Sequence, residues 1–207
     1  MEDDDALLLA WGRGDRRAGA ALIERHYDGI ERFFLSKAGD RQSDLTQQTF
    51  LRCAEAAASY RGESSPRAFL FGIARNVLFE HIRGRARDGG RPPDFDTSSV
   101  VDLMPGAATL LGQNAEQRQL ILALQRLPLE LQIIVELFYW EDFSVDELAA
   151  CVKVPAGTIK SRLHRIRALL RESLEGLPPS DGTDGARTLL EKWLLRMREQ
   201  IPGDAAG

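Results

Sequence analysis

The sequence predicts an all-α protein in which two small helical domains are joined by a flexible linker. Apolar residues recur at helical spacing along nearly the whole chain, and no segment alternates apolar and polar residues as a half-buried strand would. Residues 92–113, rich in Pro, Gly, Ser and Asp, interrupt this pattern as a linker would. We therefore expect an N-terminal domain over 1–91, a C-terminal domain over 114–176, and an extension over 177–207 with one amphipathic helix.

Three helices are expected in the N-terminal domain. The first contains Leu22 and should end near Gly39, a residue type common at helix C-termini. The second covers 43–60, where Asp44 followed by Gln47 resembles a capping box.

The third helix is expected over 67–87. One of its faces is apolar and suits a core, and Asn76, Phe79 and Arg83 should point away from it. The apolar face consists of Leu70, Ile73, Ala74, Val77, Leu78, His81 and Ile82.

After the linker, helical periodicity resumes over 115–127 and is broken at Pro128. It returns over 130–140, 144–151 and 155–171. The last two segments form a short helix, a tight turn and a longer basic helix, the pattern of a helix-turn-helix.

The basic helix combines a core stripe with a cationic face. Ile159, Leu163, Ile166 and Leu170 are spaced by four, three and four residues, and cations repeat this spacing one residue later, about 100° around the helix. Such a helix suits the DNA major groove, although a solvated basic face on an ordinary bundle helix is the alternative. The residues expected to meet base edges or phosphates are Thr158, Lys160, Ser161, Arg162, His164 and Arg165, with Arg167 as a phosphate clamp.

Composition excludes several other classes. The net charge is −4 and 43% of residues are hydrophobic, which suits a globular chain. No apolar run approaches the ~20 residues of a membrane span, and the acidic N-terminus is unlike a secretory signal. Cys53 and Cys151 lie far apart in helical patterns and should be reduced core thiols, and the three histidines have no metal-ligand spacing. We expect a cytoplasmic protein without membrane insertion, metal or cofactor.

A second basic region combines cations with aromatic residues. Residues 67–91 contain six Arg, interleaved with aromatics that include Phe69 and Phe71. Arginine beside aromatic rings suits a strand with unstacked bases. Aromatics at helical spacing are also common in cores, which is the alternative interpretation.

Three passages of the chain resemble bacterial sigma factors of the extracytoplasmic-function (ECF) type. "DLTQQTFLRC" is similar to the family's "DLVQEVFLR", and "SPRAFLFGIARNVLFEHIR" to "FRAWLYRIARNLALDHLR". The run from Leu124 to Arg171, with "KVPAGTIKSRLHRIR", resembles the family's C-terminal domain with "GVPVGTVKSRLHRAR". The resemblance covers roughly residues 16–175.

The resemblance implies a promoter-specific initiation factor rather than an enzyme, with no catalytic residues. Its implied partners are core RNA polymerase, promoter DNA and an anti-sigma factor. The helix-turn-helix would read the −35 element as duplex. Residues implied in polymerase docking are Asp44, Leu45, Gln47, Gln48 and Phe50, and those implied at the −10 element are Tyr60, Arg61, Arg75, Asn76, Phe79 and Arg83.

Three positions depart from the family's pattern, of which Phe69, standing where Trp is common, is a mild change. Gln48 replaces the usual Glu, which removes a charge from the docking segment. Lys153 stands at the turn position where Gly is usual, and costs about 1 kcal/mol if that position needs a positive φ.

The sequence also leaves room for other functions. A conventional helix-turn-helix regulator would bind duplex DNA alone as a dimer, and a protein–protein adaptor would tolerate loss of Lys160, Arg162 and Arg165. An enzyme has little support, since the sequence has no Gly-rich phosphate loop, metal cluster or plausible triad. The extension carries an apolar stripe that we expect either to restrain DNA binding or simply to cap a domain: Leu190, Trp193, Leu194, Met197 and Ile201.

Overall fold

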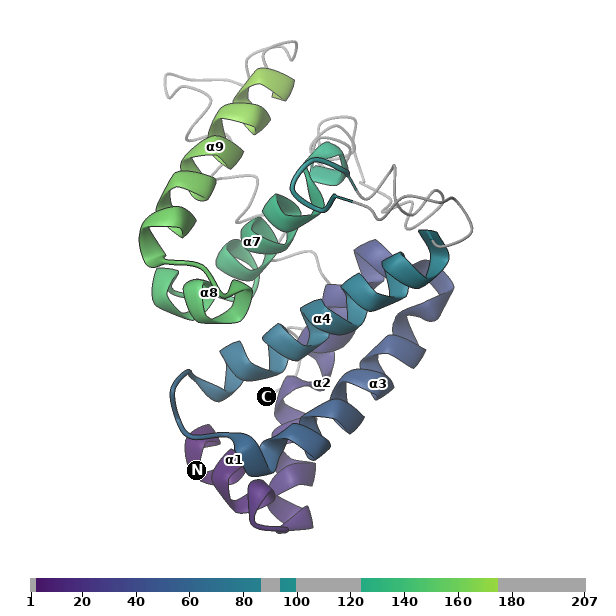
Figure 1. The fold of residues 1–207 in the computed structure, drawn as a ribbon, viewed down its shortest axis with the longest axis vertical. Helices are drawn as coiled ribbons and strands as arrows, with labels where there is room; N and C mark the ends of the chain where they lie inside the picture. The colour runs from purple at the N-terminus through teal and green to yellow at the C-terminus, as the bar shows by residue number, and fades with distance from the viewer. Residues whose placement is uncertain (1–2, 87–93, 100–123, 175–207) are drawn as a thin grey trace, which may run out of the picture. The chain divides into compact units, whose positions relative to one another are not determined.

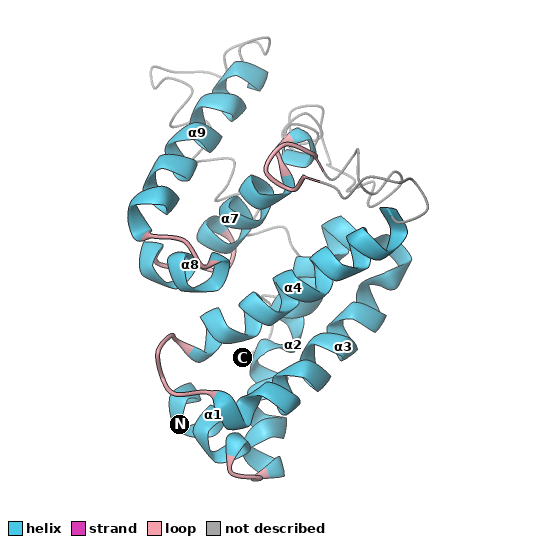
Figure 2. Ribbon diagram, in the orientation of Figure 1, coloured by secondary structure: helices cyan, strands magenta, loops and turns pink. Residues whose placement is uncertain are grey.

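The computed structural model describes residues 3–86, 94–99 and 124–174. These residues form helices joined by short loops, without a β-strand in the described ranges (Figures 1 and 2). The chain divides into two compact units, Met1–Pro93 with Asp146–Val154, and Asp94–Val145 with Pro155–Gly207. The all-α prediction is therefore confirmed.

The first unit begins with a helix that the sequence analysis missed. Helix α1 (Asp4–Gly12) buries Leu7 and Leu8 and packs against α2 (Arg16–Ala38). Asp15 caps α2, because its carboxylate accepts hydrogen bonds from the backbone N–H groups of the first helical turn.

Helix α2 ends just before Gly39, as predicted, and a 3₁₀ turn, η1 (Gly39–Arg41), leads directly into α3 (Gln42–Ala56). The predicted capping box at Asp44 is wrong. Because α3 starts at Gln42, two residues before Asp44, the Asp44 side chain lies within the first turn of the helix. It forms an ion pair with Arg41 at 3.1 Å.

Helix α4 (Pro66–Ala86) follows a second 3₁₀ turn, η2 (Ala57–Ser59), and packs on α2 and α3. Ser65 caps it, with its hydroxyl accepting from the N–H of Ala68. The apolar residues of α2, α3 and α4 form one core, in which Phe33 meets both Phe34 and Phe71 edge to face.

Both cysteines belong to the buried parts of their helices. Cys53 of α3 is fully buried and Cys151 of α8 (Val145–Val152) is 2% exposed, and neither forms a disulfide. The prediction of reduced core thiols is confirmed.

In the second unit, α7 (Leu129–Tyr139) packs against α9 (Ala156–Leu174). Part of the expected linker packs with them. The carbonyls of Phe95 and Ser98 accept hydrogen bonds from the first two N–H groups of α7, and thereby cap a helix whose N-cap is Pro128.

Some predictions lie outside the described residues. These include most of the helix expected over 115–127, of which 124–126 is seen as helical, and the whole extension over 177–207. Within the described part of the chain, no helix is long and apolar enough to cross a membrane.

Candidate nucleic-acid interface

Helix α9 presents the two faces that its sequence predicts. Ile159, Leu163, Ile166 and Leu170 are at most 5% exposed and pack toward the core of their unit. The side chains that lie on the solvent face are Lys160, Ser161, His164, Arg165 and Arg167.

The turn before α9 is the short connection that the helix-turn-helix pattern requires. Lys153 adopts a φ of 58°, in the left-handed region that favours glycine. Lys at this position, in place of the family's Gly, therefore imposes the backbone strain expected from the sequence. Pro155 then precedes α9, and its carbonyl accepts from the N–H of Thr158, which starts the helix.

Arg162 differs from the other cations of α9. Its side chain is 22% exposed, and its guanidinium lies 3.3 Å from a carboxylate oxygen of Asp96 and 4.0 Å from one of Glu130. Arg162 is therefore already paired with acids. Lys160 and Arg165, which are also expected to touch DNA, are exposed to solvent.

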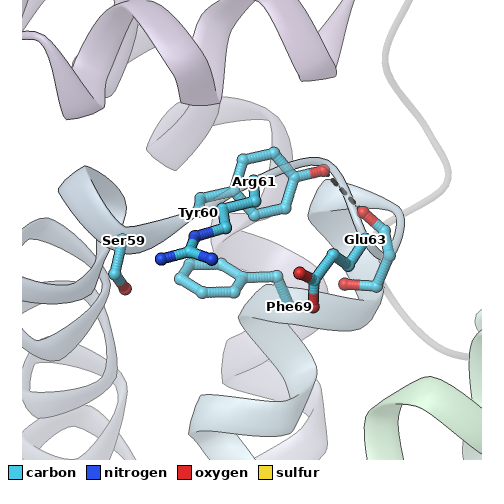
Figure 3. Close-up of a pocket in the computed structure, with 6 residues that line it drawn as sticks. Ser59, Tyr60, Arg61, Glu63 and Phe69 are labelled. Atoms are coloured by element: carbon cyan, nitrogen blue, oxygen red, sulfur yellow. Dashed lines mark hydrogen bonds between the residues drawn. The ribbon is translucent and has the colours of Figure 1, made fainter.

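A pocket of about 380 Å³ lies between η2 and the start of α4 (Figure 3). The rings of Tyr60 and Phe69 meet edge to face at 5.3 Å, and the Arg61 guanidinium and Glu63 carboxylate lie around the same space. Rings with a neighbouring guanidinium are the groups that stack on unpaired bases and neutralise phosphate. The pocket's lining residues are Ser59, Tyr60, Arg61, Glu63, Ser64 and Phe69.

On α4, the structure corrects the prediction that Phe79 points away from the core. The residue is 4% exposed, and the guanidinium carbons of Arg75 and Arg83 lie 4.3 and 5.9 Å from the centre of its ring. The aromatic residue is therefore a packing partner that orients two cations, while Asn76 and Arg83 stay exposed.

A shallow groove of about 230 Å³ runs between α3 and α4 beside these residues. It is crossed by an ion pair in which Arg52 donates to Glu80 at 2.6 Å. That hydrogen bond lowers the pKa of Glu80, so the carboxylate stays charged at neutral pH. The groove's lining residues are Arg52, Ala56, Ile73, Asn76, Glu80 and Arg83.

The residues expected to dock polymerase divide into two groups. Asp44, Gln47 and Gln48 are exposed on one face of α3, but Leu45 and Phe50 are 4% and 7% exposed and belong to the core. The last two support the helix and offer no contact surface.

Two functional candidates were missed by sequence reasoning. Leu51 is 66% exposed and lies on the same face of α3 as Gln47 and Gln48. It follows Gln47 by four residues and Gln48 by three, a helical spacing from which the sequence could have indicated it. Asp5 of α1 is hydrogen-bonded to Tyr60 at the pocket, and no spacing in the sequence indicates that contact.

Comparison with known proteins agrees with this geometry. Residues 22–88 match the family Sigma-70 region 2, and residues 117–170 match Sigma-70, region 4. The RNA polymerase sigma-H factor of Pseudomonas aeruginosa is 28% identical over 189 residues, covering 86% of this chain and 96% of that protein. The ECF RNA polymerase sigma factor SigC of Mycobacterium tuberculosis is 33% identical over 187 residues, covering 83% and 93%.

Solved structures have the same fold. The sigma factor RpoE of Bartonella quintana, in complex with the anti-sigma factor NepR, is 26% identical with a TM-score of 0.55, covering 75% of this chain and 96% of that one. CnrH, in complex with the cytosolic domain of CnrY, is 20% identical with a TM-score of 0.53 and shows the fold alone.

The chain is thus a transcription initiation factor of the sigma-70 class. Within that class it belongs to the ECF RNA polymerase sigma factors.

Proposed function

We propose that this sigma factor binds core RNA polymerase through the exposed face of α3 and contacts a promoter at two places. The strand of the −10 element is bound by the pocket and the cations of α4, and the duplex of the −35 element is bound by α9. The chain acts in the cytoplasm, where core polymerase is found, and it performs no chemistry itself.

The observation that carries this proposal is the pocket between η2 and α4. Its two rings and its guanidinium suit a single unstacked base, whereas the exposed face of α9 suits paired DNA. A regulator that reads only duplex DNA has no use for a ring-walled pocket. The combination of both features in one chain therefore supports promoter opening.

The net charge of −4 is compatible with this function. Most of the affinity for DNA comes from the assembled polymerase, so the sigma factor needs positive charge only on its contact faces. The acids of the chain also limit binding of the isolated protein to DNA.

An anti-sigma factor is the third proposed partner. The B. quintana relative was solved with such a protein bound, which supports a similar partner here. Any partner that covers the face of α3 around Leu51 would compete directly with core polymerase.

Run-off transcription with core polymerase and a genomic promoter library tests the proposal. Core polymerase with the full chain should start at a defined set of promoters, and core polymerase alone should not. A matched preparation with Arg165→Ala should initiate less at these promoters while it still binds core polymerase. If the chain leaves the start sites of core polymerase unchanged, or binds duplex operators alone as a dimer, the proposal is wrong.

A further inference from the structure

The Tyr60 hydroxyl connects the first helix of the chain to the pocket. It lies 2.7 Å from a carboxylate oxygen of Asp5 and 2.5 Å from the carbonyl oxygen of Ser64. A hydroxyl has one hydrogen, so these two acceptors share it. The pKa of Tyr60 is raised mainly by burial and, to a smaller extent, by the hydrogen bond to the Asp5 carboxylate. The hydroxyl therefore keeps its proton at neutral pH.

The groups held by this contact are walls of the pocket. Tyr60 and Ser64 both line it, and the Tyr60 ring packs against Phe69, another lining residue. Without the Asp5 acceptor, the hydroxyl loses the partner that lies outside the loop. The ring and the backbone of Ser64 then depend on contacts within the loop itself.

Helix α1 is suited to be the fixed partner because other contacts hold it. Leu7 and Leu8 are buried, and Asp4 accepts hydrogen bonds from Arg25 and His26 of α2 at 2.7 and 2.8 Å. At the other end, a Cβ added to Gly12 would lie 2.5 Å from the Ala57 carbonyl oxygen, so α1 and η2 are in close backbone contact.

We propose that Asp5 is a positioning residue for the pocket, one that presets the Tyr60 ring and the Ser64 backbone for an unpaired base. This inference rests on the proposed function. Asp5 lies outside residues 60–83, the stretch expected to contact the −10 element. Its chemical role is to accept a hydrogen bond at a fixed place.

The test uses the holoenzyme and a single-stranded non-template oligonucleotide that carries 2-aminopurine at the melted position. Asp5→Ala should weaken binding of this oligonucleotide roughly three- to tenfold, the fold-change that corresponds to the net contribution of one typical hydrogen bond. Asp5→Asn keeps an acceptor oxygen and should stay within about twofold of the wild type. Affinity for core polymerase and for an upstream duplex should not change in either variant.

Asp3→Ala is the matched control, because it removes the same charge from the start of the same helix. Asp3 is exposed and its side chain forms no capping hydrogen bond, so the loss of this side chain should leave oligonucleotide binding unchanged. Tyr60→Phe removes the hydroxyl and with it the contacts to both Asp5 and Ser64, so the loss should be at least as large as that seen for Asp5→Ala. The double variant should then be no weaker than Tyr60→Phe alone.

The outcomes separate this inference from the proposed function. If the wild-type holoenzyme does not bind the oligonucleotide selectively, both are wrong. If it does, and Asp5→Ala or Tyr60→Phe binds equally well, the positioning role alone is overturned. The same follows if Asp5→Asn is as weak as Asp5→Ala, because the carboxylate then acts through its charge rather than as a placed acceptor.

Discussion

A carboxylate oxygen of Asp96 lies 3.3 Å from the guanidinium of Arg162, so an acid of the segment before α7 pairs with a cation of α9, the helix proposed to bind DNA. Asp96 is 64% exposed, and in the proposed complex it would compete with a DNA phosphate for the same guanidinium. Asp96→Ala should therefore raise affinity for duplex −35 DNA by roughly two- to fivefold at low salt, the range expected for a solvent-exposed ion pair. The gain should shrink as salt rises.

Fluorescence anisotropy of the holoenzyme with an upstream duplex measures this effect. The matched control is the same change in an Arg162→Ala background, where Asp96 has lost its partner and its removal should add little. An equal gain in both backgrounds would mean that Asp96 acts by general repulsion of DNA.

Arg165 and Arg162 should have separable effects. Arg165 is exposed, so Arg165→Ala should cost about 1–3 kcal/mol of specific binding if it touches a base, without lowering the melting temperature. Arg162→Ala also breaks the contacts with Asp96 and Glu130, and should lower the thermal stability of the second unit. Calorimetry with binding curves on matched and mismatched duplexes checks both. Loss on all sequences alike would identify Arg165 as a phosphate contact.

Leu51 should contribute to polymerase binding. Because it is 66% exposed beside Gln47 and Gln48, Leu51→Asp should weaken binding to core polymerase by roughly tenfold or more and leave the fold intact. Leu35→Asp is the matched control, since Leu35 is an exposed leucine of α2, at 42%. Equal affinities for core polymerase in the two variants would remove Leu51 from the docking face.

His81 should make the stability of the first unit depend on pH. Burial, followed by the charges of Arg85 and Arg41, lowers the pKa of His81 below its ordinary 6.5, and its Nε2 atom has no hydrogen-bond partner among the described residues. As pH falls below 6.5 the unfolded chain takes up the proton first, so the free energy of unfolding should decrease on acidification. Denaturation at pH 7.5 and 5.5 measures the difference.

In His81→Leu this part of the pH dependence should disappear, because the leucine does not titrate. His164→Leu, at an exposed site on α9, should retain it. An unchanged pH profile in His81→Leu would contradict the assignment.

Lys153→Gly should stabilise the protein. At a φ of 58° a non-glycine residue is strained by about 1 kcal/mol, which glycine relieves at some cost in unfolded-state entropy. The melting temperature should rise by a few degrees. Lys153→Ala keeps the strain and controls for loss of the side-chain charge. A drop in stability for the glycine variant would mean that the Lys153 side chain offsets the strain.

Strongly periodic segments were predictable because their structure is dominated by the burial of regularly spaced apolar residues. The buried stripe of α9 and the end of α2 at Gly39 follow from apolar spacing and from a helix-stop residue. Helix α1 escaped notice because "DDALLLAWG" has consecutive leucines and no helical period. The capping box failed because η1 runs straight into α3, which places Asp44 inside the helix.

The site was predictable only in part, because its details are tertiary. Spacing indicated the cations of α9, but not that Asp96, from a segment expected to be linker, contacts one of them. Phe79 looked exposed from its angular position, and its burial follows from the guanidinium groups of Arg75 and Arg83 beside the ring. The link from Asp5 to Tyr60 spans 55 residues, which no local pattern encodes.

The burial of the two native thiols has a practical consequence for experiments. Burial raises the pKa of the Cys53 thiol to about 12, so at neutral pH only about one molecule in 10⁵ carries the reactive thiolate there. Cys151 is equally shielded from solvent, at 2% exposed. A maleimide dye should therefore attach selectively to a cysteine introduced at a surface position, without prior removal of either native one. Pairs of such dyes would then report how the distance between the two helical units changes when polymerase engages them.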